Sequence, residues 1–183
     1  MRRLCPALSI LLLAATLAAA QQTRTEVTRT TTPAEDSKAN SPDVPDVYAI
    51  PCHLERTLIL RFKYQADLLA GLERMVKENG IRNAVILAGA GSLRNYHIHT
   101  VSNSTFPSKN VFVKDPTAPS DLLNMNGYVV DGRVHAHVTL ANPDGAFGGH
   151  LEPDTTVFTF AVVTLGVLGD DVDLSRIDDK TYR

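Results

Sequence analysis

The chain has 183 residues, with 18 Lys and Arg against 20 Asp and Glu, and a formal net charge of −2. This length allows one domain of typical size with short appendages and excludes a large multidomain enzyme. The balanced charge does not favour a nucleic-acid binder, which normally carries a basic excess. The two cysteines exclude a disulfide-dense scaffold.

Residues 1–20 are typical of a secretory signal peptide. Arg2 and Arg3 precede an apolar run at 8–17, and the small residues at 18–20 form a cleavage site. The run is shorter than the roughly 20 apolar residues that span a membrane. We therefore expect a secreted or periplasmic protein without a membrane span after cleavage. An uncleaved anchor at the membrane surface is the alternative.

Cleavage after residue 20 changes the net charge and the number of cysteines. It removes two positive charges and no negative ones, so 16 Lys and Arg remain against 20 Asp and Glu, and the net charge becomes −4. It also removes Cys5 and leaves Cys52 alone, which excludes an internal disulfide. Cys52 is then expected to be a buried free thiol or to pair with another chain.

Residues 21–47 are rich in Thr, Ser, Pro and Gln and offer little apolar surface to bury. Such a segment cannot offset its chain entropy, which predicts a disordered linker. The folded domain is then expected to cover residues 48–183.

Within this domain, apolar periodicity predicts both strands and a helix. Asp67 is placed as the N-cap, or in the first turn, of a helix that ends at Gly80, and a glycine turn at 89–91 is expected to end a short buried strand. Further strands are expected after it, with a turn at 142–145. The expected strands are 57–62, 84–88, 96–101, 124–130, 134–140, 147–151 and 155–168. One or two helices with about seven strands predict an α+β fold.

The histidines carry the strongest functional signal. His135 and His137 lie two residues apart on an expected strand, so their side chains share a face and can bind one metal ion. His150 follows beyond the turn at 142–145. If Asn142 pairs with Gly145, His137 faces His150 and His135 faces Glu152, which gives three imidazoles and an optional carboxylate.

Two alternatives to this arrangement remain open. A type I turn with a bulge at Gly145 would shift the register by one residue and turn His150 to the other face. A second bulge at Gly148 and Gly149 would restore it. Without a metal, these histidines are polar residues of a solvated or subunit-contact face.

His97 and His99 form a second pair of this kind, able to join the same site, to form another one or to face solvent. His53 has no partner at a suitable spacing.

Several motifs resemble the PPC (plants and prokaryotes conserved) domain family. The motifs are His135-Ala136-His137, the turn at 142–145 and Gly148-Gly149-His150-Leu151, followed by a long apolar strand. The segment 67–81 resembles the family's first helix, 89–93 its glycine-serine turn, and residues 174–179 its closing segment. The resemblance covers about residues 55–183.

This resemblance implies a twisted, mostly antiparallel sheet with one or two flanking helices, similar in fold to acetolactate decarboxylase, and a homotrimer. It also implies that His135, His137 and His150 hold a divalent metal ion, with zinc expected and iron as the alternative. His97 and His99 are possible additional ligands. They could compensate for a family glutamate, whose expected position is taken here by Phe160-Ala161.

The expected function is that of an exported metal-binding protein, with lyase or hydrolase chemistry on a small molecule. A metal ion would act there as a Lewis acid. Glu152 is the candidate acid, and Arg133 or Arg94 could hold a carboxylate. One alternative is the DNA-binding role of plant relatives, although no basic AT-hook segment is present. The other is a trimeric scaffold without chemistry.

Overall fold

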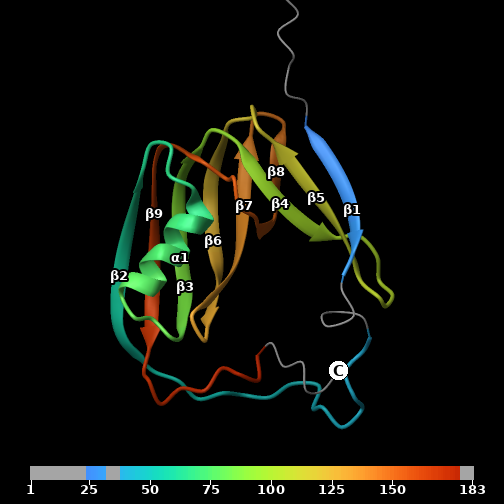
Figure 1. The fold of residues 1–183 in the computed structure, drawn as a ribbon, viewed down its shortest axis with the longest axis vertical. Helices are drawn as coiled ribbons and strands as arrows, with labels where there is room; N and C mark the ends of the chain where they lie inside the picture. Colours follow the sequence, from blue (N-terminus) through green and yellow to red (C-terminus); the bar gives the residue numbers. More distant parts are fainter. Residues whose placement is uncertain (1–23, 32–37, 178–183) are drawn as a thin grey trace, which may run out of the picture.

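A computed structural model describes residues 24–31 and 38–177. The expected signal peptide lies outside these residues. The described part folds as one nine-stranded antiparallel sheet with a single helix (Figure 1). The strands follow the order β1-β5-β4-β8-β7-β6-β3-β9-β2 across the sheet. No helix in this part is long and apolar enough to cross a membrane.

The elements have the following bounds. The helix α1 is Leu68–Glu78, and the strands are β1 Thr25–Thr30, β2 Leu54–Lys63, β3 Ala84–Leu93, β4 Tyr96–Val101, β5 Lys109–Asp115, β6 Ser120–Val130, β7 Arg133–Asn142, β8 Gly145–Leu151 and β9 Val157–Leu168.

The expected α+β class is wrong, because the described chain is mostly β. A parallel sheet needs crossover segments, usually helices, whereas antiparallel neighbours can be joined by short turns. All strand pairs here are antiparallel, and β6, β7 and β8 follow one another through tight turns. The sheet therefore needs no second helix, and α1 packs against it in contact with β2 and β7.

The helix begins where the sequence predicts it. Asp67 is its N-cap, and Oδ1 of this residue accepts a hydrogen bond from the Ala70 N–H at 2.8 Å. Leu68, Leu72 and Val76 repeat every four residues and are almost completely buried against the sheet. Burial of side chains of this size stabilises a fold by about 1.5–3 kcal/mol each.

Two strands, β1 and β5, lie outside the elements expected from the sequence. β1 falls within residues 21–47, which were predicted as a disordered linker, and it pairs with β5 at one edge of the sheet. All six of its side chains are exposed, which explains why no burial pattern marks it. β3 also differs, because it continues through the glycines at 89–91 with bulges against β9.

The two ends of the domain pack against each other. Val130, Leu168, Val172 and Leu174 form a small second core, with Ile50 partly buried against it. Cys52 is exposed, so the expectation that its thiol is buried is wrong.

Gly127 allows β6 to approach β7 closely beside His135. Its φ is +136°, which L residues with a side chain rarely adopt. A Cβ at this position would also collide with the backbone carbonyl oxygen of His135.

We expect Gly127→Ala to destabilise the fold by about 3 kcal/mol, because left-handed strain of about 1–2 kcal/mol adds to the backbone collision. Gly132→Ala is the matched control, because Gly132 has a φ of +76° but open space around its Cβ position. It should cost only the strain. Urea unfolding measures both free energies, and equal losses would contradict the role given to the close approach.

Candidate metal centre

β7 places two histidine rings side by side. Alternate side chains of a strand point to opposite faces, and Ala136 and Val138 point into the core. His135 and His137 therefore share the other face, where both are exposed to solvent. Their Nε2 atoms lie 3.2 Å apart.

The register of β7 and β8 brings His150 to this pair. Asn142 pairs with Gly145 across a two-residue turn, and His137 pairs with His150. Oδ1 of Asn142 accepts hydrogen bonds from the N–H groups of Asp144 and Gly145, at 2.9 and 3.2 Å. The His150 ring stands edge-on to the rings of both His135 and His137, with centroids 4.9 and 5.3 Å apart. The bulged register, which would have turned His150 away, does not occur.

His99 joins the group from the other side of β8. β4 pairs His99 with His150, and the two rings stack with centroids 4.6 Å apart and an interplanar angle of 22°. A Cβ on Gly149 would collide with the carbonyl oxygen of His99, so glycine is needed here for the two strands to lie this close. Three strands thus align His137, His150 and His99 in one row.

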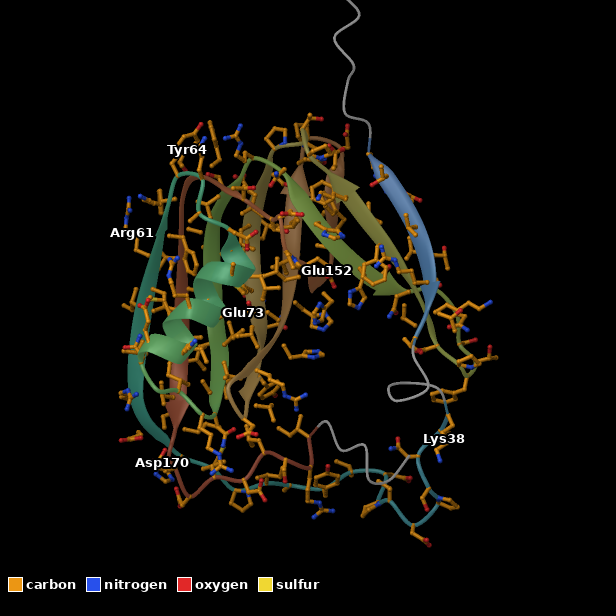
Figure 2. All side chains as sticks on the ribbon, viewed as in Figure 1. Lys38, Arg61, Tyr64, Glu73, Glu152 and Asp170 are labelled. Atoms are coloured by element: carbon orange, nitrogen blue, oxygen red, sulfur yellow. The ribbon has the colours of Figure 1, made fainter. Side chains whose placement is uncertain are left out.

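Glu152 closes the group just beyond the end of β8. Its Oε1 accepts a hydrogen bond from Nδ1 of His99 at 2.6 Å and lies 3.4 Å from Nδ1 of His150. Nδ1 of His150 is buried and has no well-formed hydrogen bond among the described residues. The side chain of Glu152 is only 18% exposed, and Figure 2 labels it near the middle of the view.

His99, His150 and Glu152 offer ligand atoms that all lie within 4.8 Å of one another. In the part of the chain that the structure describes, no other His, Cys, Asp and Glu side chains meet this condition in a group of three or more.

His99, His135, His137, His150 and Glu152 form a histidine cluster, and two of its members have a shifted pKa. Burial lowers the pKa of His137 below its usual value, and positive charge on His150, His135 and His99 lowers it further. Burial alone would raise the pKa of Glu152, but its interactions with His150 and His99 outweigh this effect and lower the pKa to about 2. Glu152 is therefore ionised at neutral pH.

Two cavities adjoin the row of histidines. One, of about 560 Å³, is lined by all four histidines of the cluster and by residues of β5 and the loop before it, including Phe106 and Asn110. The other, of about 480 Å³, is lined by His135, His137, Arg133 and Tyr128. Both volumes are in the range of small-molecule sites.

The remaining candidates have different positions. Nδ1 of His97 lies 2.9 Å from the carbonyl oxygen of Pro153, so this ring is engaged outside the cluster. Arg94 lies beside Tyr64, with Nη1 3.3 Å from the phenol oxygen. β5 was missed in the sequence, although the β-branched and aromatic residues at 111–113 are a weak strand signal that could have indicated it.

The low pKa of Glu152 predicts how stability depends on pH. A carboxyl group with a depressed folded-state pKa stabilises the fold above its unfolded-state pKa, and the contribution is lost as the pH falls toward the folded-state value. We expect Glu152→Gln to destabilise the protein near pH 6, and the difference from wild type to shrink between about pH 5 and 2. Urea unfolding of both proteins across this range measures the difference in unfolding free energy. A difference that stays constant with pH would contradict the lowered pKa of Glu152.

Comparisons with known proteins identify relatives of this chain. A search of curated proteins finds no match. A protein from Pyrococcus horikoshii, described as a plant- and prokaryote-conserved (PPC) protein, is 29% identical with a TM-score of 0.56, and the match covers 69% of this chain and 89% of the other. The metal-containing protein AF0104 from Archaeoglobus fulgidus is 24% identical with a TM-score of 0.53, covering 66% and 86%.

A hypothetical protein from Salmonella cholerae-suis is 24% identical, with a TM-score of 0.55 and coverage of 66% and 81%. At this identity, the Salmonella and Archaeoglobus structures show a shared fold. The family model of the Plants and Prokaryotes Conserved (PCC) domain matches residues 51–169, which include every residue of the histidine cluster. The chain therefore belongs to the Plants and Prokaryotes Conserved domain family.

Proposed function

We propose that the chain binds a divalent metal ion, zinc or iron, at the histidine cluster. The observation that carries this proposal is the 3.2 Å between the Nε2 atoms of His135 and His137. Two nitrogens that bind the same tetrahedral zinc at about 2.0–2.1 Å lie about 3.3 Å apart. The pair therefore already has the spacing that a shared ion requires.

His150 is proposed as the third ligand. Its ring contacts the rings of both His135 and His137. Its buried Nδ1, which lies 3.4 Å from Oε1 of Glu152, has no well-formed hydrogen bond among the described residues. A buried polar atom of this kind is costly unless a further partner satisfies it. His150 is also a member of the group with His99 and Glu152, so every proposed arrangement of ligands includes it.

Glu152 and His99 suit either of two roles. As a neighbour of the ligands, the Glu152 carboxylate holds the Nδ1–H of His99 and fixes which nitrogen of that ring is available, as carboxylates commonly do beside metal-bound imidazoles. As a direct ligand, Glu152 would form a set of two histidines and one carboxylate with His99 and His150, which is typical of non-haem iron. We propose the first role for zinc and the second for iron.

A bound ion would supply Lewis-acid polarisation of a carbonyl or carboxylate oxygen. The residues that line the adjoining cavities determine which small molecules can reach the ion. Both cavities are lined by His135 and His137, and both have a volume that suits a small molecule. We include in the proposal lyase chemistry on such a molecule, the class to which acetolactate decarboxylase belongs, or hydrolase chemistry.

We also propose that the chain is exported and forms a homo-oligomer, a trimer by resemblance to its family. Large apolar side chains from three adjacent strands support association, because Leu87, Leu123, Phe158 and Phe160 are each about half exposed. Exposed apolar surface of this kind often marks a protein interface.

Metal analysis of protein purified without chelators tests the proposal. We expect about one zinc or iron ion per chain, and loss of the ion in the His150→Ala variant. The double variant His135→Ala/His137→Ala should also lose zinc, whereas Glu152→Gln should keep the stoichiometry and bind zinc about 10–100-fold more weakly.

His53→Ala is the matched control, because the side chain of His53 is exposed beside Asp171. It should bind metal as the wild type does. Protein that holds less than about a tenth of an ion per chain, even after exposure to zinc or iron salts, would overturn the proposal. Loss of iron but not zinc in Glu152→Gln would assign Glu152 as a direct iron ligand.

A further inference from the structure

The cavity of about 480 Å³ beside His135 and His137 is lined by both polar and apolar side chains. β6 and β7 pair Val130 with Arg133, Tyr128 with His135, and Asn126 with His137. Directly paired residues of antiparallel strands project to the same face. Arg133, His135 and His137 therefore follow one another along one face of β7, with about 7 Å between successive Cα atoms.

Arg133 is a cation at this cavity without an anionic partner in the described structure. Its guanidinium makes no hydrogen bond or ion pair with residues 24–31 or 38–177. The nearby Asp131 instead lies 3.5 Å from Nε of Arg82. Arg94 contrasts with Arg133, because it contacts the ring and the hydroxyl of Tyr64. Arg133 is thus the guanidinium that remains available beside the histidine pair.

The cavity also has an apolar lining. Val130, Val134 and Ile177 contribute it, and Val130 is almost completely buried. A ligand that fits both kinds of lining carries a negative group and a small hydrocarbon part. Carboxylates match a guanidinium especially well, because two parallel N–H groups can donate to the two oxygens.

We propose that this cavity binds a small organic carboxylate that carries a second oxygen donor, such as a 2-oxo or 2-hydroxy acid. The carboxylate contacts Arg133, and the second oxygen coordinates the ion held by His135 and His137. The second half of this assignment rests on the proposed metal centre, whereas the contact with Arg133 does not. Tyr128 and Asn126, which pair with the two histidines, offer hydrogen bonds to the same ligand.

Isothermal titration of the zinc-loaded protein with pyruvate and with pyruvamide tests the proposal. The two probes have the same shape, but only pyruvate carries the negative charge. We expect pyruvate to bind at least tenfold more tightly than pyruvamide. We also expect Arg133→Gln to weaken pyruvate binding about tenfold or more, because the charge-assisted hydrogen bonds to the carboxylate are lost. Arg94→Gln is the matched control and should leave pyruvate affinity unchanged.

The same titration on chelator-treated protein separates this proposal from the metal centre. Weaker binding of pyruvate without zinc supports coordination of the second oxygen. Binding that depends on Arg133 but not on zinc would keep the carboxylate site and remove its link to the ion. Equal affinity for pyruvate and pyruvamide, unchanged affinity in Arg133→Gln, or no pyruvate binding by zinc-loaded protein would overturn the proposal.

Discussion

The register between β7 and β8 is the constraint on which the site depends. Side chains along a strand alternate between faces, so a shift of one residue would move the imidazole of His150 from the cluster to the core side. The two-residue turn prevents this shift, because Oδ1 of Asn142 accepts hydrogen bonds from Asp144 and Gly145 and holds the pairing of Asn142 with Gly145. A local turn thus determines the chemistry of residues up to eight positions away.

The cluster itself concentrates groups that repel one another when protonated. The lowered pKa of His137 records this repulsion together with burial. Glu152 is the negatively charged member of the cluster. Its interactions with His99 and His150 keep this carboxylate ionised although it is little exposed. A cation in the cluster would replace the protons as the source of positive charge, so metal binding and protonation compete for the same nitrogens.

Much of the site was predictable, because its signals are local. The shared face of His135 and His137 follows from the two-residue period of a strand, and the turn at Asn142 follows from the chemistry of a short turn. The contact with His150 was one of two registers that this turn allowed, and the structure selects it. The helix is also marked locally, by the N-cap Asp67 and the apolar residues every four positions.

The rest depends on contacts between distant segments. Nothing near His99 in the sequence shows that β4 pairs with β8, because strand order is set by packing over the whole sheet. The expected α+β class failed for a related reason. Composition and periodicity count elements, but they do not show that every neighbour is antiparallel and that one helix suffices. β1 has six exposed residues and owes its existence to the free edge of β5.

The pairing of β4 with β8 has a mechanical consequence. Only two residue pairs, Ile98 with Leu151 and His99 with His150, join these strands, whereas β7 and β8 share six. The sheet therefore consists of a small leaf, formed by β1, β5 and β4, and a large leaf, with a narrow seam between them. His99 belongs to the small leaf and His150 to the large one. A ligand bound by both side chains would therefore link the two parts of the sheet at their narrowest junction.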